Sequence, residues 1–289
     1  MCDQDSIDDM LQYASRTELT RRRFGALSLG SGLAMVLPRA ADAAEVTEKD
    51  IEIKTPDGIC DAYFVHPASG KHPGVLIWAD ALGLRPSFRQ MAKRLAESGY
   101  SVLVPNPFYR KKKAPIVGAG ASFQDPEVRR TVVAMMAALN PETHVADAKA
   151  FVAFLDQQSA VDTKRKLATT GYCMGGPITM RTAANFPDRI GAAASFHAGG
   201  LVTDKLDSPH LLVPKMKVEY LIAIADNDDK RQPEAKETLK QAFADAKLKA
   251  EIEVYEGAQH GWCPPDSQVY NESQAEKAWS RMLATLRVV

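Results

Sequence analysis

The chain has 289 residues, of which 45% are hydrophobic and 25% charged, a balance that excludes a disordered or collagen-like protein and suits one large α/β domain. Its 36 basic and 36 acidic side chains cancel, so charge gives no reason to expect nucleic acid or an anionic membrane as a partner. We therefore predict an ordinary soluble surface.

The first 43 residues have the layout of an export signal. Basic residues at Arg21–Arg23 precede an uncharged run at 25–37 and an Ala-x-Ala cleavage site at Ala41–Ala43. The paired arginines followed by Phe24 resemble a twin-arginine (Tat) signal of bacteria. The uncharged run is shorter than the roughly 20 residues that span a bilayer, which favours a cleaved signal over a retained anchor. We expect the Tat machinery to export residues 44–289 to the periplasm.

Four cysteines occur, at Cys2, Cys60, Cys173 and Cys263. Because Cys2 falls in the expected signal, the mature chain has an odd number, and at least one thiol stays unpaired in an oxidising compartment. The sequence leaves open whether Cys60 and Cys263 pair. Neither a Cys-x-x-Cys pair nor zinc-type spacing of histidines is present, so we expect no metal site.

Strands and helices are expected to alternate along the mature chain. A hairpin is predicted over 46–65, turning at Pro56–Gly58. Continuous apolar runs such as Gly74–Ala79 suit parallel strands that are buried on both faces. This alternation predicts a single domain over 44–289, with a doubly wound, mostly parallel sheet flanked by helices. The other predicted elements are strands at 101–104, 166–170, 190–196, 220–225 and 251–255, and helices at 87–97, 126–139, 143–157, 177–184, 233–246 and 273–286.

The segment Gly171–Gly176, Gly-Tyr-Cys-Met-Gly-Gly, lies between an expected strand and an expected helix. Strand, Gly-x-Cys-x-Gly, helix is the layout of a nucleophile elbow, with Cys173 in the place of the usual serine. In such a strained turn a side chain at Gly171 or Gly175 would crowd the neighbouring elements. The helix N-terminus favours a thiolate and a developing oxyanion. Alternatively, the glycines only shape a tight turn and Cys173 is a small buried residue.

A cysteine nucleophile needs a base and a carboxylate that orients the base. Asp228 follows the predicted strand at 220–225, and His260 follows the predicted strand at 251–255. This is the chain order of α/β hydrolases, and both residues fall at the edge where open α/β sheets bind ligands.

Other residues near these positions offer alternatives. Asp226 and Asp229 share the loop of Asp228, and any of the three can instead cap the next helix; we favour Asp228 as the partner of the histidine. His197 also follows a strand, and we expect it to line the site rather than act as the base.

These motifs, with Asn106–Arg110, resemble the dienelactone hydrolase family (carboxymethylenebutenolidases) from about residue 45 to the C-terminus. The resemblance implies an α/β-hydrolase fold and a triad of Cys173, His260 and Asp228. It also implies hydrolysis of an enol-lactone through an acyl-thioester, without a cofactor.

The resemblance implies further site residues. Asp80 stands where the family has a glutamate that contacts the resting thiol, and the backbone N–H groups of Ala81 and Met174 would form the oxyanion hole. A substrate-binding arginine of the family, four residues after the histidine, is replaced by Pro264, which argues against dienelactone itself as substrate. Candidates for the remaining substrate contacts are Arg129, Arg130, Tyr109, His197 and Trp262.

From the sequence we predict a secreted cysteine hydrolase that acts on a small lactone or ester. Two alternatives remain open. A general carboxylesterase or thioesterase would use the same residues, and a ligand-binding or redox-sensing protein would use the same scaffold without catalysis by Cys173.

Overall fold

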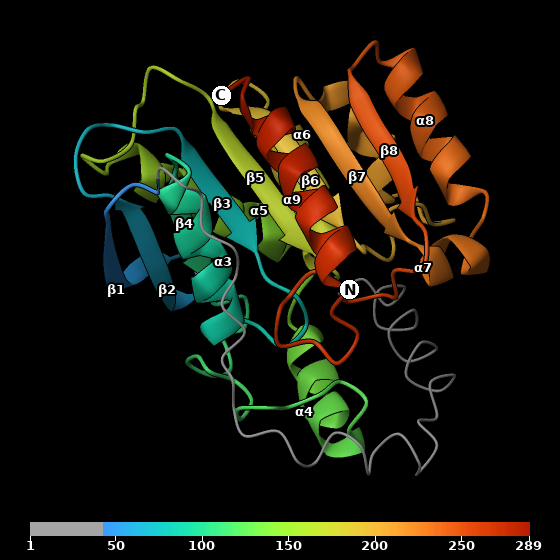
Figure 1. Ribbon diagram of the computed structural model, residues 1–289, viewed down its shortest axis with the longest axis horizontal. Helices are drawn as coiled ribbons and strands as arrows, with labels where there is room; N and C mark the ends of the chain where they lie inside the picture. Colours follow the sequence, from blue (N-terminus) through green and yellow to red (C-terminus); the bar gives the residue numbers. More distant parts are fainter. Residues whose placement is uncertain (1–42) are drawn as a thin grey trace.

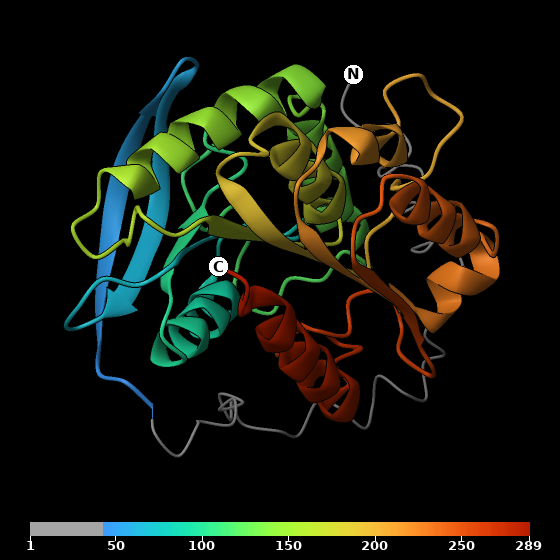
Figure 2. The same ribbon diagram turned by 90° about the horizontal axis from the view of Figure 1, so that it is seen from above.

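The computed structural model describes residues 43–289 as an eight-stranded sheet with helices on both faces (Figures 1 and 2). The strand order is β1-β2-β4-β3-β5-β6-β7-β8. β1 and β2 pair antiparallel, as do β2 and β4, and all other neighbours are parallel. The strands are β1 (Val46–Thr55), β2 (Gly58–Pro67), β3 (Gly74–Trp78), β4 (Ser101–Pro105), β5 (Leu167–Tyr172), β6 (Ile190–Phe196), β7 (Glu219–Ala225) and β8 (Ala250–Tyr255).

The helices divide between the two faces of the sheet. α3 and α9 bury their apolar sides in one hydrophobic cluster, and α5, α6 and α8 bury theirs in the cluster on the opposite face (Figure 2). α4 lies beyond the sheet edge and contributes to a third, smaller cluster, which includes Cys173 and Met174 (Figure 1). The helices are α3 (Pro86–Glu97), α4 (Pro126–Met136), α5 (Pro141–Asp156), α6 (Gly175–Asn185), α7 (Asp226–Arg231), α8 (Ala235–Asp245), α9 (Glu272–Leu286) and the 3-10 helix η1 (Pro209–Lys215).

This architecture is the α/β-hydrolase fold and confirms the fold class predicted from the sequence. The apolar runs of β3 and β4 are buried along their whole length because helices cover both faces of the sheet. The first hairpin turns at Gly58, whose positive φ of 138° is open to glycine and strained for other residues.

Three features differ from the sequence-based expectation. The stretch after β7, expected as a loop, forms the short helix α7, and the single helix expected at 233–246 begins only at Ala235 as α8. Three aspartates fall in the first turn of α7, where negative charge is favourable beside the helix dipole. The 3-10 helix η1 was not expected, because its prolines and its short length leave no helical periodicity.

The cysteine pairing that the sequence left open does not form. Cys60, Cys173 and Cys263 are all buried, and none of the three forms a disulfide. Cys60 packs in the cluster with α5 and α6, whereas Cys263 packs on the opposite face with α3 and α9. Burial raises the pKa of both Cys60 and Cys263, so both stay protonated and unreactive.

The predicted export signal lies almost entirely in residues 1–42, outside the described residues. Of the helices within 43–289, none has both the length and the apolar character that a membrane crossing requires. The same residues contain no cluster of histidine, cysteine and carboxylate side chains arranged to hold a metal ion.

The close packing of β5 on α6 gives the first prediction. A Cβ at Gly171 would collide with the carbonyl oxygen of Gly175, which is backbone and cannot rotate away, and with Oγ1 of Thr179. We expect Gly171→Ala to lower the free energy of unfolding by about 2–3 kcal/mol in urea titrations, as overpacking does elsewhere. Gly118→Ala is the control: its Cβ would meet no atom within 4 Å, and it should change stability by no more than about 0.5 kcal/mol. Equal effects of the two substitutions would contradict this account.

Candidate active site

Cys173 occupies the sharp turn between β5 and α6. Its φ is +53°, a left-handed conformation that is strained for a residue with a side chain. Two backbone hydrogen bonds hold this conformation. The N–H of Cys173 donates to the carbonyl of Phe196 at 3.0 Å, and the carbonyl of Cys173 accepts from the N–H of Gly176 at 3.0 Å. The turn therefore has the strained geometry that the glycine spacing predicts.

The structure brings Cys173, His260 and Asp228 together at the carboxyl edge of the sheet. Nε2 of His260 lies 3.2 Å from Sγ of Cys173, and Nδ1 of His260 lies 2.7 Å from Oδ2 of Asp228. All three side chains are buried. The backbone N–H of His260 donates to the side-chain oxygen of Asn227 at 2.8 Å, which fixes the histidine loop to α7.

The alternative aspartates of the same helix have other partners. Asp226 pairs with Lys230 at 2.8 Å, and Asp229 pairs with Lys236 at 2.7 Å. Asp228 is the buried member of the three, and its second oxygen accepts from Arg231 at 3.0 Å. The helical conformation of α7 thus selects which carboxylate reaches His260.

The electrostatics of His260 favour its charged form. Burial by itself lowers the pKa of the imidazole, but the charges of Asp228 and Cys173 outweigh burial and raise the pKa well above 6.5. The raised pKa favours an imidazolium between Asp228 and the sulfur, an arrangement that suits a thiolate nucleophile.

His197 lies beside this group and lines the cavity. Its ring centroid is 5.2 Å from that of His260 and 5.2 Å from that of Trp262, and its backbone φ is +39°. Neither ring nitrogen has a hydrogen-bond partner among the described residues. Burial lowers the pKa of His197 well below 6.5, with a further contribution from the charge of His260, so its ring is neutral.

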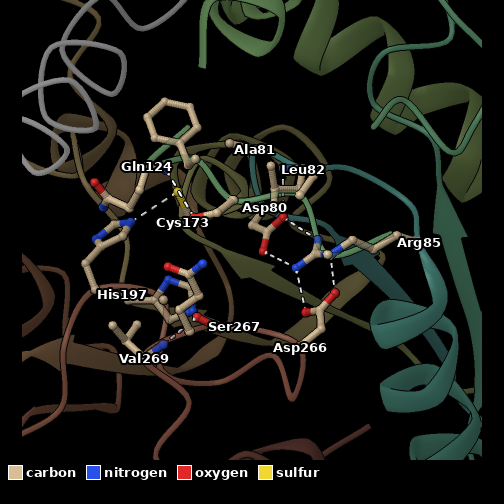
Figure 3. Close-up of a pocket in the computed structure, with 17 residues that line it drawn as sticks. Asp80, Ala81, Leu82, Arg85, Gln124, Cys173, His197, Asp266, Ser267 and Val269 are labelled. Carbon is tan, nitrogen blue, oxygen red and sulfur yellow. Dashed lines mark hydrogen bonds and ion pairs between the residues drawn. The ribbon is translucent and has the colours of Figure 1, made fainter. Parts of the chain in front are cut away.

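A cavity of about 170 Å³ opens above Cys173 (Figure 3). It is formed by residues from six separate segments of the chain, four of which are loops beyond the sheet edge. These four loops are 80–85, 120–124, 260–261 and 266–269, and the other two contributions are Cys173 and His197 at the ends of strands. The lining residues are Asp80, Ala81, Leu82, Arg85, Gly120, Ala121, Ser122, Phe123, Gln124, Cys173, His197, His260, Gly261, Asp266, Ser267, Gln268 and Val269.

Asp80 lines the cavity, but its carboxylate is paired with Arg85, a residue that sequence reasoning missed (Figure 3). Nη1 of Arg85 donates to Oδ1 of Asp80 at 2.6 Å, and Nη2 donates to Oδ2 at 2.9 Å. The same oxygen Oδ1 accepts from the N–H of Leu82 at 2.9 Å. In the sequence, the position of Arg85 in the same loop as Asp80, immediately before helix α3, could have suggested that the two residues pair.

The two residues expected to supply the oxyanion hole flank Cys173. Ala81 lines the cavity next to Asp80, and Met174 is the N-cap residue of α6, where backbone N–H groups have no partner within the helix. Both residues pack with Cys173 in the third hydrophobic cluster.

Four further candidates for substrate contacts do not line the cavity. The hydroxyl of Tyr109 donates to Asp147 at 2.8 Å, and Trp262 is fully buried behind His197. Arg130 pairs with Glu127 on the surface of α4, and Arg129 lies half-buried on the same helix. The segment 120–124 faces the cavity in their place; it lacks the periodicity that would have identified it in the sequence.

The charge balance at His260 gives the second prediction. In pH titrations followed by ¹⁵N–¹H NMR of the imidazole, we expect the midpoint for His260 to lie above 6.5. Cys173→Ala should lower this midpoint, because it removes one of the negative charges that stabilise the imidazolium. Cys60→Ala, which removes a distant buried thiol, is the control and should leave the midpoint in place. A midpoint at or below 6.5 in the wild type would contradict the proposed charge state.

Comparison with known proteins places this geometry in a family. The model of the dienelactone hydrolase family matches residues 60–289. A protein of Methylorubrum extorquens named "Putative carboxymethylenebutenolidase" is 28% identical, over 95% of this chain and 94% of that protein. A protein of Salmonella typhi with the same name is 30% identical over 77% of this chain and 80% of that protein.

The fold has solved counterparts as well. The crystal structure of a "Putative Dienelactone Hydrolase" from Klebsiella pneumoniae superposes with a TM-score of 0.71 at 24% identity, covering 83% of this chain and 98% of that one. On the extent of the family match, the chain belongs to the dienelactone hydrolase family.

Proposed function

We propose that this protein hydrolyses a small lactone or ester with Cys173 as nucleophile, His260 as acid and base, and Asp228 as the group that orients the histidine. By its family the chain is a carboxylic ester hydrolase. The observation that carries the finer proposal is the continuous contact from sulfur to imidazole to carboxylate, 3.2 Å and 2.7 Å, at the base of a cavity.

In the first half of the proposed reaction the thiolate of Cys173 attacks the substrate carbonyl. The N–H groups of Ala81 and Met174 stabilise the negative charge that develops on the carbonyl oxygen. Each donor of this type lowers the activation free energy by about 3–4 kcal/mol. The imidazolium of His260 then donates its Nε2 proton to the departing alkoxide. An alcohol leaves, or remains tethered in the case of a lactone, and the sulfur carries an acyl-thioester.

In the second half of the reaction the proton affinity of His260 falls. Once the sulfur is acylated it carries no charge, so one cause of the raised pKa of His260 is gone. The now neutral imidazole can take a proton from water, and the resulting hydroxide attacks the thioester. The acid is released, and the thiolate and imidazolium form again. Asp228 keeps Nε2 directed at the sulfur throughout.

The third prediction tests the nucleophile. Cys173→Ala should lower kcat/KM for p-nitrophenyl acetate and for a small lactone by about 10³-fold or more, as removal of a nucleophile does in related triads. Cys60→Ala is the matched control, because Cys60 is also a buried thiol but packs away from the cavity, and it should retain activity. Mass spectrometry after brief exposure to substrate should find the acyl group on residue 173.

Each alternative gives a different outcome. Ready turnover of acyl-CoA or p-nitrophenyl esters without turnover of lactones would favour a general thioesterase or carboxylesterase. Ligand binding without turnover, unchanged in Cys173→Ala, would favour a non-catalytic binding or redox-sensing protein and would overturn the proposal.

We also propose that residues 1–43 direct Tat export, which rests on the sequence of this segment alone. Expressed in a bacterium with a Tat system, the protein should fractionate with the periplasm after cleavage near Ala43. Replacing Arg22 and Arg23 together by lysine should retain the precursor in the cytoplasm, whereas Lys111→Arg, in a basic run of the mature chain, should not alter export. Export that is indifferent to the arginine pair would contradict a Tat signal.

A further inference from the structure

A buried guanidinium with all its donors occupied forms one wall of the cavity. Nε of Arg85 donates to Oδ2 of Asp266 at 2.7 Å, and Nη2 donates to Oδ1 of Asp266 at 3.0 Å. With the two bonds to Asp80 and one from Nη1 to the carbonyl of Gly83 at 3.3 Å, five hydrogen bonds engage the five N–H groups of the side chain. Arg85 therefore has no donor left for a ligand.

The group formed by Asp80, Arg85 and Asp266 carries a net charge of −1, since two carboxylates flank one guanidinium. The Arg85 side chain is only 8% exposed, but that of Asp266 is 44% exposed, so the solvent-accessible member of the group is a carboxylate. Burial by itself lowers the pKa of the Arg85 guanidinium. The charges and hydrogen bonds of Asp80 and Asp266 outweigh burial and raise the pKa above its ordinary value, so the guanidinium stays charged.

The remaining lining residues do not offset this negative charge. In the proposed mechanism Cys173 and His260 form a thiolate–imidazolium pair without net charge, and burial lowers the pKa of His197 so that its ring is neutral. Arg85 is the only arginine or lysine among the described residues that line the cavity. The other lining side chains are apolar or uncharged and polar, including Leu82, Phe123, Gln124, Ser267 and Val269.

From this arrangement we infer that Asp80, Arg85 and Asp266 together set the substrate class, and that the enzyme acts on uncharged esters or lactones and discriminates against substrates whose acyl part carries a carboxylate. A carboxylate in the cavity would meet a net negative wall and would find no cationic donor to replace its hydration. An uncharged acyl group meets apolar walls and neutral polar groups. This inference rests on the proposed function and adds the substrate class to it.

The group also has a structural role, because it ties the 80–85 loop to the loop that contains Asp266, 181 residues apart in sequence. A purely structural role predicts that removing one carboxylate affects all substrates alike. A role in specificity predicts that the preference between charged and uncharged substrates changes. The ratio of two kcat/KM values, measured in one enzyme preparation, separates these possibilities because loss of folded protein cancels in the ratio.

The test uses two esters that differ only in charge: the mono-p-nitrophenyl ester of adipic acid, and its analogue in which an uncharged amide replaces the terminal carboxylate. We expect the wild type to favour the amide by about 10-fold or more in kcat/KM. The preference should shrink as the salt concentration rises, because ions screen the interaction. Asp266→Asn should reduce the preference about 10-fold, since it neutralises the wall and frees at least one N–H of Arg85 for the substrate carboxylate.

The control is Asp188→Asn, which removes the same charge from an exposed pair with Lys217 and should leave the preference unchanged. Competitive inhibition by adipate and adipamide gives a second measurement that needs no turnover of the test esters. Comparable kcat/KM for both esters in the wild type, or an unchanged preference in folded Asp266→Asn, would overturn the inference while leaving the proposed hydrolase in place. Absence of turnover of any ester, lactones included, would overturn the proposed function and this inference with it.

Discussion

The contact between Nε2 of His260 and Sγ of Cys173 depends on the parallel sheet. The two residues are 87 positions apart, and they meet because β5, β6, β7 and β8 end at one edge in matching register. Tyr172 pairs with Phe196 at the ends of β5 and β6, and Ala225 pairs with Tyr255 at the ends of β7 and β8. Because Phe196 pairs with Ala223, β7 and β8 extend two residues further at this edge. Only short loops are then needed to bring sulfur, imidazole and carboxylate into contact.

The same edge holds two strained residues side by side. Cys173 and His197 both have positive φ, each at the end of a central strand, at a cost of roughly 1–3 kcal/mol per residue. Their backbone N–H groups continue the ladder of the sheet: Cys173 donates to Phe196 and His197 donates to Ala223, at 3.0 and 2.9 Å. Because these bonds are buried and paired across neighbouring strands, the sheet stabilises both strained residues and holds the two side chains rigidly.

The sequence indicated the elements and residues whose signals are local. The apolar runs form the central strands, and the glycines around Cys173 lie in the turn between β5 and α6. Cys173, Asp228 and His260, which follow three of the strands, are in contact. The sequence shows Arg85 in the loop of Asp80, but the second carboxylate partner, Asp266, lies 181 positions away and has no local signal. The segment 120–124 has no periodicity, and its contact with the cavity follows only from tertiary packing.

Tyr109 was a candidate for contact with the substrate, but it lies outside the cavity. It belongs to a stretch that resembles the family, and this suggested contact with the substrate. In the structure its hydroxyl is held between Thr55 and Asp147, where Arg110 also binds. Tyr109 therefore belongs to a buried polar network that contacts the hairpin of β1 and β2. The local sequence pattern does not distinguish a residue of such a network from one that binds a ligand.

The site thus divides its chemistry from its selectivity. Cys173 stands at the end of β5 and Asp228 in the first turn of α7, while His260 stands in the loop after β8, which Asn227 anchors to α7. The cavity walls come from loops, of which the 80–85 and 266–269 segments are joined by Arg85. Side chains on loops change without disturbing the sheet, so proteins that share the reaction need not share the substrate. For this chain the family fixes the type of bond that is cleaved, and we propose that the charges on the cavity wall decide which acyl group reaches the sulfur.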